Sequence, residues 1–177
     1  MMLEPPKKKR RTLGSHQSAR MISDTWLTPP HVIAALGGAR SFDLDPASPI
    51  TRPWPTAKRH YTIIDDGLAQ PWRGRTWLNP PFGPPKQIAP WLKRMAVHNH
   101  GTLLIAARTE TIAFFDFVWN RATALLFLRG RLYFHDAAGV RAKANCGAPI
   151  VLAAYGKRDA GILRNCGLDG QFIQLRQ

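Results

Sequence analysis

The sequence predicts a single α/β domain with a mainly parallel, twisted sheet flanked by helices. Short apolar or β-branched runs alternate with segments of helical periodicity, which is the pattern of a sheet with crossover helices. The chain has 177 residues, a length that suits one domain, and 45% of them are hydrophobic, enough for an ordinary core. No apolar run approaches the roughly 18 residues that would span a bilayer, so we expect no membrane partner.

The first 20 residues are expected to form a disordered basic arm, and the folded domain is expected to span residues 21–177. Five consecutive cations stand at Lys7 to Arg11, with no apolar periodicity after them. Such a run could neutralise DNA phosphates, act as a nuclear-import signal, or have no function. No apolar segment follows it, as a secretory signal would require, and Cys146 and Cys166 form no disulfide framework. We therefore expect a cytoplasmic protein.

The first half of the chain is expected to hold one helix and three strands. Thr28 can cap a helix whose first turn contains proline, and Gly37-Gly38 ends that helix after residues 31–36. Alternating or β-branched residues predict strands at 41–45, 60–64 and 76–79.

The second half continues the alternation of helices and strands. A helix is expected over 86–98, with Pro90 either kinking it or marking its first turn, and another over 109–121, capped by Thr109. Continuous apolar runs predict strands buried on both faces at 101–107 and 122–128. Two more strands are expected at 131–134 and 149–155, on either side of a polar loop.

The tetrapeptide Asn79-Pro80-Pro81-Phe82 follows a predicted strand, and ligands of open α/β sheets bind beyond the carboxyl ends of strands. The two prolines remove two N–H donors, so the side-chain carbonyl of Asn79 and the main-chain carbonyl of Pro80 remain as acceptors. Phe82 adds a flat apolar surface. Such a site suits a planar group with an N–H₂ to donate, although Asn-Pro-Pro is also ordinary turn chemistry.

Methylation of an exocyclic amine needs such an arrangement. The lone pair of the adenine amine is delocalised into the ring, and two acceptors that hold both N–H bonds can free it. In-line attack on a sulfonium methyl then depends on positioning more than on a strong base. Because a base inside a duplex cannot reach such a site, the nucleotide would have to flip out and stack on Phe82.

Four segments in this order, TWLTPPHVIAALG, FDLDPAS, DDGLAQPW and GRTWLNPPFG, resemble the phage-type DNA N-6-adenine methyltransferases (Dam-like), over roughly residues 24–155. The resemblance implies a Rossmann-like methyltransferase fold, S-adenosylmethionine as methyl donor and double-stranded DNA as substrate. It also implies that Asn79, Pro80, Pro81 and Phe82 are the catalytic residues.

The cofactor that this resemblance implies carries an ammonium group and a ribose diol, which carboxylates at strand ends can bind. Its expected binding residues share a position at predicted strand ends or loops: Thr28, Pro29, Asp43, Asp45, Pro46, Ala47, Asp65 and Asp66. Each aspartate could instead be a cap or turn residue. Pro46 and Ala47 stand where a glycine-rich turn is common in related folds.

Basic residues predict a polyanion partner. Residues 67–177 carry fifteen Lys or Arg and five Asp or Glu, whereas residues 21–66 have a net charge of −1. Charge alone would also keep a basic protein soluble. The candidate DNA contacts precede the last expected strand: Arg129, Arg131, and, in the loop before that strand, Arg141 and Lys143. No metal site is expected, because His98 and His100 have no ligand partner at the right spacing, and no obligate protein partner is inferred.

Two alternatives stay open. The amine could belong to cytosine (N-4) or to a protein glutamine, or the chain could be an inactive nucleic-acid-binding relative. The basic charge favours nucleic acid over protein, and the intact tetrapeptide at 79–82 argues against lost activity.

Overall fold

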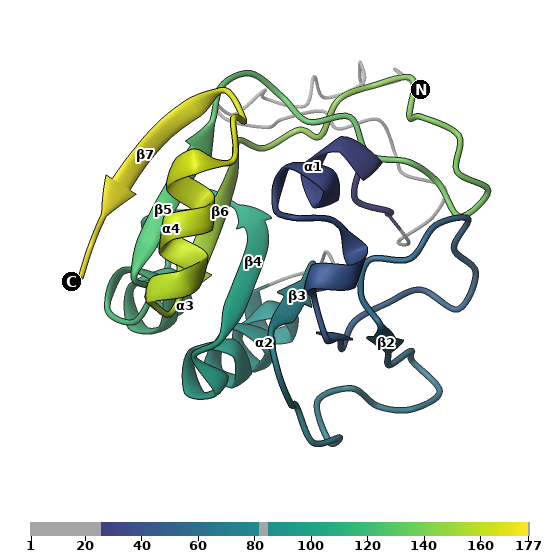
Figure 1. The fold of residues 1–177 in the computed structure, drawn as a ribbon, viewed down its shortest axis with the longest axis horizontal. Helices are drawn as coiled ribbons and strands as arrows, with labels where there is room; N and C mark the ends of the chain where they lie inside the picture. Colours follow the sequence, from purple (N-terminus) through teal and green to yellow (C-terminus); the bar gives the residue numbers. More distant parts are fainter. Residues whose placement is uncertain (1–25, 82–84, 177) are drawn as a thin grey trace, which may run out of the picture.

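The computed structural model describes residues 26–81 and 85–176 (Figure 1). The basic arm expected at 1–20 and the predicted catalytic residue Phe82 lie outside these ranges. The elements follow one another in the order α1 (Pro30–Ala35), a 3-10 turn η1 (Ala39–Ser41), β1 (Leu44–Asp45), β2 (Arg59–His60), β3 (Thr76–Leu78), α2 (Pro85–His98), β4 (Gly101–Ala106), α3 (Ile112–Phe114), a π-helical turn η2 (Phe115–Trp119), β5 (Ala124–Leu128), β6 (Ile150–Tyr155), α4 (Lys157–Asn165) and β7 (Gly170–Gln174).

One mixed sheet of seven strands, in the order β2-β1-β3-β4-β6-β5-β7, runs through the described part of the chain. The pairs β2–β1, β1–β3 and β3–β4 are parallel, whereas β4–β6, β6–β5 and β5–β7 are antiparallel and include most of the paired residues. The prediction of a mainly parallel sheet is therefore wrong. The chain passes from β5 to β6 through a loop without a crossover helix, so β6 returns in the opposite direction.

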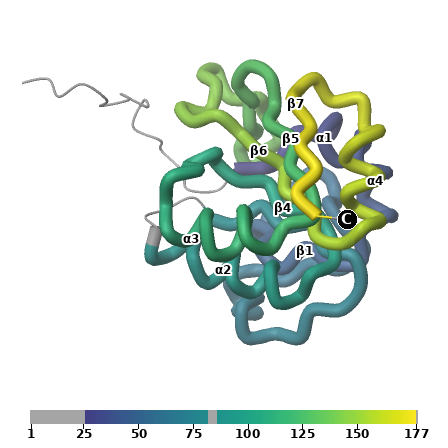
Figure 2. Tube along the Cα trace, turned by 90° about the vertical axis from the view of Figure 1, so that its left-hand side faces the viewer, coloured from purple at the N-terminus to yellow at the C-terminus, as the bar shows by residue number. Residues whose placement is uncertain are grey.

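Helices cover both faces of the sheet, α2 and α3 on one face and α1 and α4 on the other (Figure 2). Neighbouring residues of each strand point to opposite faces, so they enter different cores. Trp77 packs in the core that contains Val32 of α1, and Leu78 packs in the core that contains Met95 of α2. This double burial explains why the central strands have continuous apolar runs.

The strand predicted at 60–64 is limited to Arg59–His60. Asp65 accepts hydrogen bonds from the main-chain N of Thr62 at 2.7 Å and from its hydroxyl at 2.9 Å, which favours a turn over an extended strand. The strand predicted at 41–45 is likewise reduced to Leu44–Asp45, and its first predicted residue, Ser41, belongs to η1.

The segment after β5 is irregular, so the strand predicted at 131–134 is wrong. Leu132 and Phe134 are buried, and their carbonyls accept hydrogen bonds from Cys146 and Ala142 across the loop rather than from the sheet. The helix predicted at 109–121 is wrong in its bounds, because it starts at Ile112 and becomes π-helical. Its cap is the neighbouring Thr111, whose hydroxyl accepts from the main-chain N of Phe114 at 3.4 Å.

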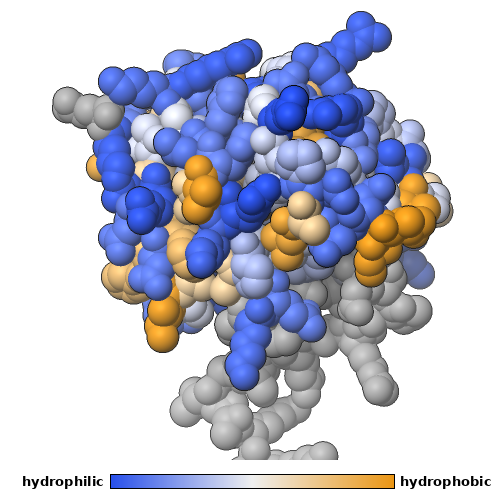
Figure 3. Space-filling view, turned by 90° about the horizontal axis from the view of Figure 1, so that it is seen from below, coloured by the Kyte–Doolittle hydropathy of each residue, from blue (hydrophilic) through white to orange (hydrophobic). Residues whose placement is uncertain are grey.

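Two elements near the C-terminus, α4 and β7, were not predicted. The helix has a polar sequence, KRDAGILRN, with few residues buried against the sheet, and β7 is an edge strand that is largely exposed. Within the described ranges, no helix combines the length and the apolar character needed to cross a membrane. On the face seen from below, hydrophilic side chains predominate and hydrophobic ones form separate patches (Figure 3).

A fully buried ion pair joins β3 to α4. The guanidinium Nε of Arg75 lies 2.8 Å from a carboxylate oxygen of Asp159, and both side chains are completely buried. The hydroxyl of Thr102 donates to the same oxygen at 3.0 Å. Arg75 also donates to the carbonyl of Leu36, at 3.1 Å, and stacks over the ring of Phe42. The pair thereby ties α4, the sheet and the end of α1 together.

We expect the Asp159→Ala variant to lose about 3–5 kcal/mol of unfolding free energy, because it leaves a buried guanidinium without its counter-ion. Urea unfolding followed by circular dichroism measures this loss. The matched control is Asp169→Ala, which removes an exposed partner 3.8 Å from Arg129 and should leave the midpoint unchanged. Equal midpoint shifts in the two variants would contradict the role assigned to Arg75 and Asp159.

Candidate active site

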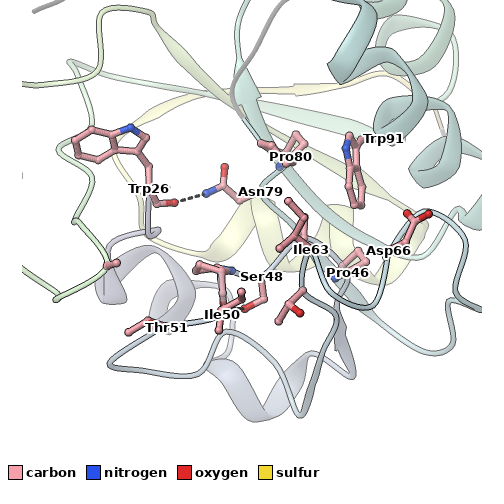
Figure 4. Close-up of a pocket in the computed structure, with 16 residues that line it drawn as sticks. Trp26, Pro46, Ser48, Ile50, Thr51, Ile63, Asp66, Asn79, Pro80 and Trp91 are labelled. Atoms are coloured by element: carbon pink, nitrogen blue, oxygen red, sulfur yellow. Dashed lines mark hydrogen bonds between the residues drawn. The ribbon is translucent and has the colours of Figure 1, made fainter. Parts of the chain in front are cut away.

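The pocket lies where the sheet changes its strand order. After β1 the chain continues to β2 on one side, and after β3 it continues to β4 on the other, so the connections that leave these two neighbouring strands run in opposite directions. Open α/β sheets bind ligands at such a switch point. A cavity of about 710 Å³ opens here, lined by the loop after β1, the turn at 62–67 and the segment Asn79-Pro80-Pro81 (Figure 4).

Asn79 stands immediately after β3, with its amide held in one orientation. Its Nδ2 donates to the main-chain carbonyl of Trp26 at 3.3 Å and contacts the hydroxyl oxygen of Thr28 at 3.2 Å. A carbonyl can only accept, so the nitrogen must face Trp26 and the oxygen must face away. That oxygen, Oδ1, is buried and has no hydrogen-bond partner among the described residues. It is a buried, unpaired acceptor on a residue that lines the pocket.

Thr28 supports Asn79 instead of capping α1, so the predicted helix cap is wrong. The N-cap of α1 is Pro29, and no side chain in the described structure caps this helix. Thr28 is buried, and its own carbonyl accepts from the indole N–H of Trp54 at 3.2 Å. The hydroxyl is therefore directed to Asn79, and tertiary contacts hold it there.

Asp45 ends β1 and shapes the loop that lines the pocket. One carboxylate oxygen accepts from the main-chain N of Ala47 at 3.1 Å, and the other accepts from the hydroxyl of Thr56. Burial raises the pKa of Asp45 from 3.8 to about 6, outweighing the hydrogen bonds from Thr56 and Ala47 that lower it. Pro46 and Ala47 lie directly on the pocket wall.

The turn opposite this loop brings the carboxylate of Asp66 to the pocket. Asp66 is exposed, lines the cavity and has a positive φ of 53°, a conformation that aspartate tolerates better than most residues. Gly67 follows it, and a Cβ there would overlap the main-chain oxygen of Pro46. Only glycine allows the two loops to pack backbone against backbone.

The other two aspartates predicted at the cofactor site have partners elsewhere. Asp43 forms an ion pair with Lys58 at 2.8 Å and accepts from the main-chain N of Arg75, and these interactions lower its pKa. Hydrogen bonds from Thr62 lower the pKa of Asp65. The structure thus brings Pro46, Ala47, Asp66, Asn79, Pro80 and Pro81 together on the pocket wall. Asp45 and Thr28 do not line the pocket but bond to the wall residues Ala47 and Asn79, and Pro29 is the N-cap of α1 and does not line the pocket.

Sequence reasoning missed several wall residues that come from distant segments. Trp26 precedes α1, Ile63 belongs to the turn, and Trp91 extends from α2 toward the cavity (Figure 4). In the structure Ile63 is 87% exposed, whereas Trp26 and Trp91 are partly buried. None of these residues belongs to a local motif, so only the fold brings them together.

The four basic residues predicted to contact DNA lie on the connection between β5 and β6. Arg141 stacks over the ring of Tyr133, 3.8 Å from its centre, and Arg131 donates to the carbonyl of Gly147. Arg129 lies 3.8 Å from Asp169, and Lys143 is exposed. The same connection passes along the edge that holds the carboxyl end of β4 and brings Ala137 to the pocket (Figure 1).

A cavity at the switch point of an α/β sheet, with an unpaired amide oxygen at a strand end, is typical of a ligand-binding α/β protein. The family model described as DNA N-6-adenine-methyltransferase (Dam) matches residues 15–163. The chain belongs to this family of DNA adenine methyltransferases, which confirms the resemblance noted in the sequence. Comparisons with curated proteins and with solved structures found no match. Across the described residues, no group of three or more His, Cys, Asp or Glu could hold a metal ion.

The raised pKa of Asp45 predicts a pH-dependent stability. Between pH 4 and 6 the carboxyl of Asp45 is mostly ionised in the unfolded state but still protonated in the folded state. Raising the pH over this range therefore favours unfolding. Moving a pKa from 3.8 to about 6 corresponds to about 3 kcal/mol at most. We expect the wild-type protein to lose stability relative to Asp45→Asn over this range, measured by urea unfolding at each pH.

The matched control is Asp43→Asn, whose parent carboxyl has a lowered pKa. There the sign reverses and the window lies at lower pH: the wild-type protein should gain stability relative to Asp43→Asn as the pH rises toward 3.8, and the difference should stay level between pH 4 and 6. Parallel pH profiles for wild-type and Asp45→Asn would contradict the burial argument.

Proposed function

We propose that this protein transfers a methyl group from S-adenosylmethionine to the N-6 amine of adenine in double-stranded DNA. The observation that carries the proposal is the buried Oδ1 of Asn79, an acceptor without a partner in the described structure. Its amide is locked from the other side by Trp26 and Thr28, so it is pre-organised for an incoming N–H.

We propose that the fold is a Rossmann-like methyltransferase fold. Although most paired residues are antiparallel, β4 and β5 both run opposite to β6, so they run parallel to each other. Of the seven strands in the described ranges, five therefore point the same way, and their carboxyl ends lie at the edge that holds the pocket. This common direction, with the switch point between β1 and β3, supports the assignment.

The chain's own acceptors activate the amine. Asn79 Oδ1 accepts one N–H, and the main-chain carbonyl of Pro80 accepts the other. Together they draw the nitrogen toward tetrahedral geometry and release its lone pair from the ring. Positive charge that develops on the nitrogen is stabilised by the same two oxygens, which need no reorganisation. The bound cofactor supplies an electrophilic methyl group on a sulfonium.

The pocket wall provides groups that suit this cofactor. Asp66 exposes a carboxylate that can bind a ribose diol or an ammonium group, while Ile63 and Trp91 offer apolar surface for a flat ring. Asp45 acts behind the wall, because both of its oxygens already accept hydrogen bonds from the chain. We therefore assign the ligand-facing carboxylate to Asp66 and a positioning role to Asp45.

DNA approaches the edge formed by the connection between β5 and β6. The exposed cations of this connection lie beside the pocket mouth. They include Arg141, whose guanidinium group stacks on the ring of Tyr133. We propose that these residues contact phosphates and that the basic arm at 1–20 adds further contacts. Because Asn79 Oδ1 is buried, the target adenine must leave the duplex to reach it.

We expect Asn79→Ala to reduce the methylation rate by about 10²–10³, because it removes a pre-organised acceptor for the reacting amine. Binding of S-adenosylmethionine, measured by calorimetry, should persist. Nucleoside mass spectrometry of treated DNA reports the product and separates N-6-methyladenine from N-4-methylcytosine.

The matched control is Asn165→Ala, an exposed asparagine on α4 whose amide bonds within its own helix. It should retain the wild-type rate. Near wild-type turnover in Asn79→Ala would place the reacting centre elsewhere, and N-4-methylcytosine as sole product would replace adenine with cytosine as the target.

Arg141→Ala tests the DNA surface. If Arg141 contacts a phosphate, the slope of log K against log salt should become shallower by about one unit. The control is Arg158→Ala, which removes an equal charge from the first turn of α4, after the end of β6 and so at the opposite edge of the sheet. Fluorescence anisotropy at several salt concentrations measures both slopes, and identical slopes in the two variants would refute the assignment.

A further inference from the structure

We infer that the indole N–H of Trp26 donates a hydrogen bond to ring nitrogen N1 of the flipped adenine, beside the amine that Asn79 binds. The inference rests on the proposed function and adds a base-recognition residue to it. An indole N–H can only donate. In Trp26 this atom is buried and has no partner in the described parts of the chain, although the residue lines the pocket.

Trp26 is held firmly beside Asn79. Its main-chain carbonyl accepts from Asn79 Nδ2 at 3.3 Å. The next residue, Leu27, exchanges two main-chain hydrogen bonds with His135, at 2.8 and 3.1 Å. In the close-up, the indole nitrogen and Asn79 Oδ1 both lie above the hydrogen bond that joins the two residues (Figure 4). One neighbouring pair of residues therefore presents a donor and an acceptor in a fixed relation.

Two unpaired buried polar atoms on residues that line one pocket are costly unless a ligand satisfies them. The Watson–Crick edge of adenine carries an amine donor next to a ring-nitrogen acceptor, which complements the acceptor of Asn79 and the donor of Trp26. Guanine and thymine present the reverse order, a carbonyl next to an N–H, so both contacts would be mismatched. Cytosine has the same order as adenine, so this pair selects amine-bearing bases and rejects the other two.

The test combines Trp26→Phe with DNA that carries 1-deazaadenine at the target position, in which a C–H replaces N1. We expect the wild-type protein to lose about tenfold in kcat/KM on 1-deazaadenine relative to adenine, the value of one hydrogen bond to a buried group. Trp26→Phe should treat the two substrates within about twofold of each other. Comparing ratios removes the intrinsic reactivity of the analogue and any general effect of the smaller ring.

Two controls complete the design. DNA with 7-deazaadenine keeps N1 and should be methylated by the wild-type protein at nearly the adenine rate. Trp119→Phe removes an indole N–H that already donates to the carbonyl of Thr109, and it should preserve the wild-type ratio between substrates. Thermal melting checks that both variants fold. If Trp26→Phe does not fold, the wild-type loss on 1-deazaadenine is compared with the wild-type loss on 7-deazaadenine, and equal losses would overturn the inference.

Equal wild-type rates on adenine and 1-deazaadenine would overturn the inference, as would an unchanged ratio in Trp26→Phe or a loss on 7-deazaadenine instead. These outcomes leave the proposed function intact. If the wild-type protein methylates no adenine in any DNA, the proposed function itself fails, and the two failures are thus distinguishable.

Discussion

The buried ion pair between Arg75 and Asp159 is the constraint on which the site depends. Arg75 immediately precedes β3, and Asn79 immediately follows it, so anchoring one end of this short strand fixes the other. The same guanidinium donates to the end of α1 through Leu36, and Thr28 lies just before the start of that helix. A single charged group therefore restrains both Asn79 and the hydroxyl that orients it. Removing either charge would leave the other buried, so the pair is costly to break.

Some polar side chains at the pocket bond to one another, and two polar atoms have no partner in the described structure. The hydroxyl oxygen of Thr28 accepts a hydrogen bond from Asn79 instead of capping a helix. The carboxylate of Asp45 accepts hydrogen bonds from Ala47 and Thr56. These groups satisfy one another and stiffen the wall. By contrast, Asn79 Oδ1 and Trp26 Nε1 are buried without partners in the described structure. Burying these two atoms without partners costs free energy, and a ligand with a matching donor and acceptor would restore their hydrogen bonds.

Charge is separated between the pocket and its surroundings. Asp66 lies on the pocket wall, whereas the cations of the connection between β5 and β6 lie on the surface beside it. A small cationic ligand and a polyanion can therefore bind next to each other without competing for the same groups. The stacking of Arg141 on Tyr133 restrains one of these cations. This arrangement agrees with a family that acts on DNA.

The sequence by itself determined the family, the central strands, α2 and the position of Asn79 at a strand end, because burial periodicity and proline stops are local properties. Only the tertiary structure decided the direction of β6, because an apolar run carries no direction. It also decided that Thr28 supports Asn79, a residue 51 positions away, instead of capping α1. The unpaired atoms of Trp26 and Asn79 could not be foreseen either. Whether a buried donor or acceptor has a partner depends on which segments the fold brings together, and no local pattern encodes that.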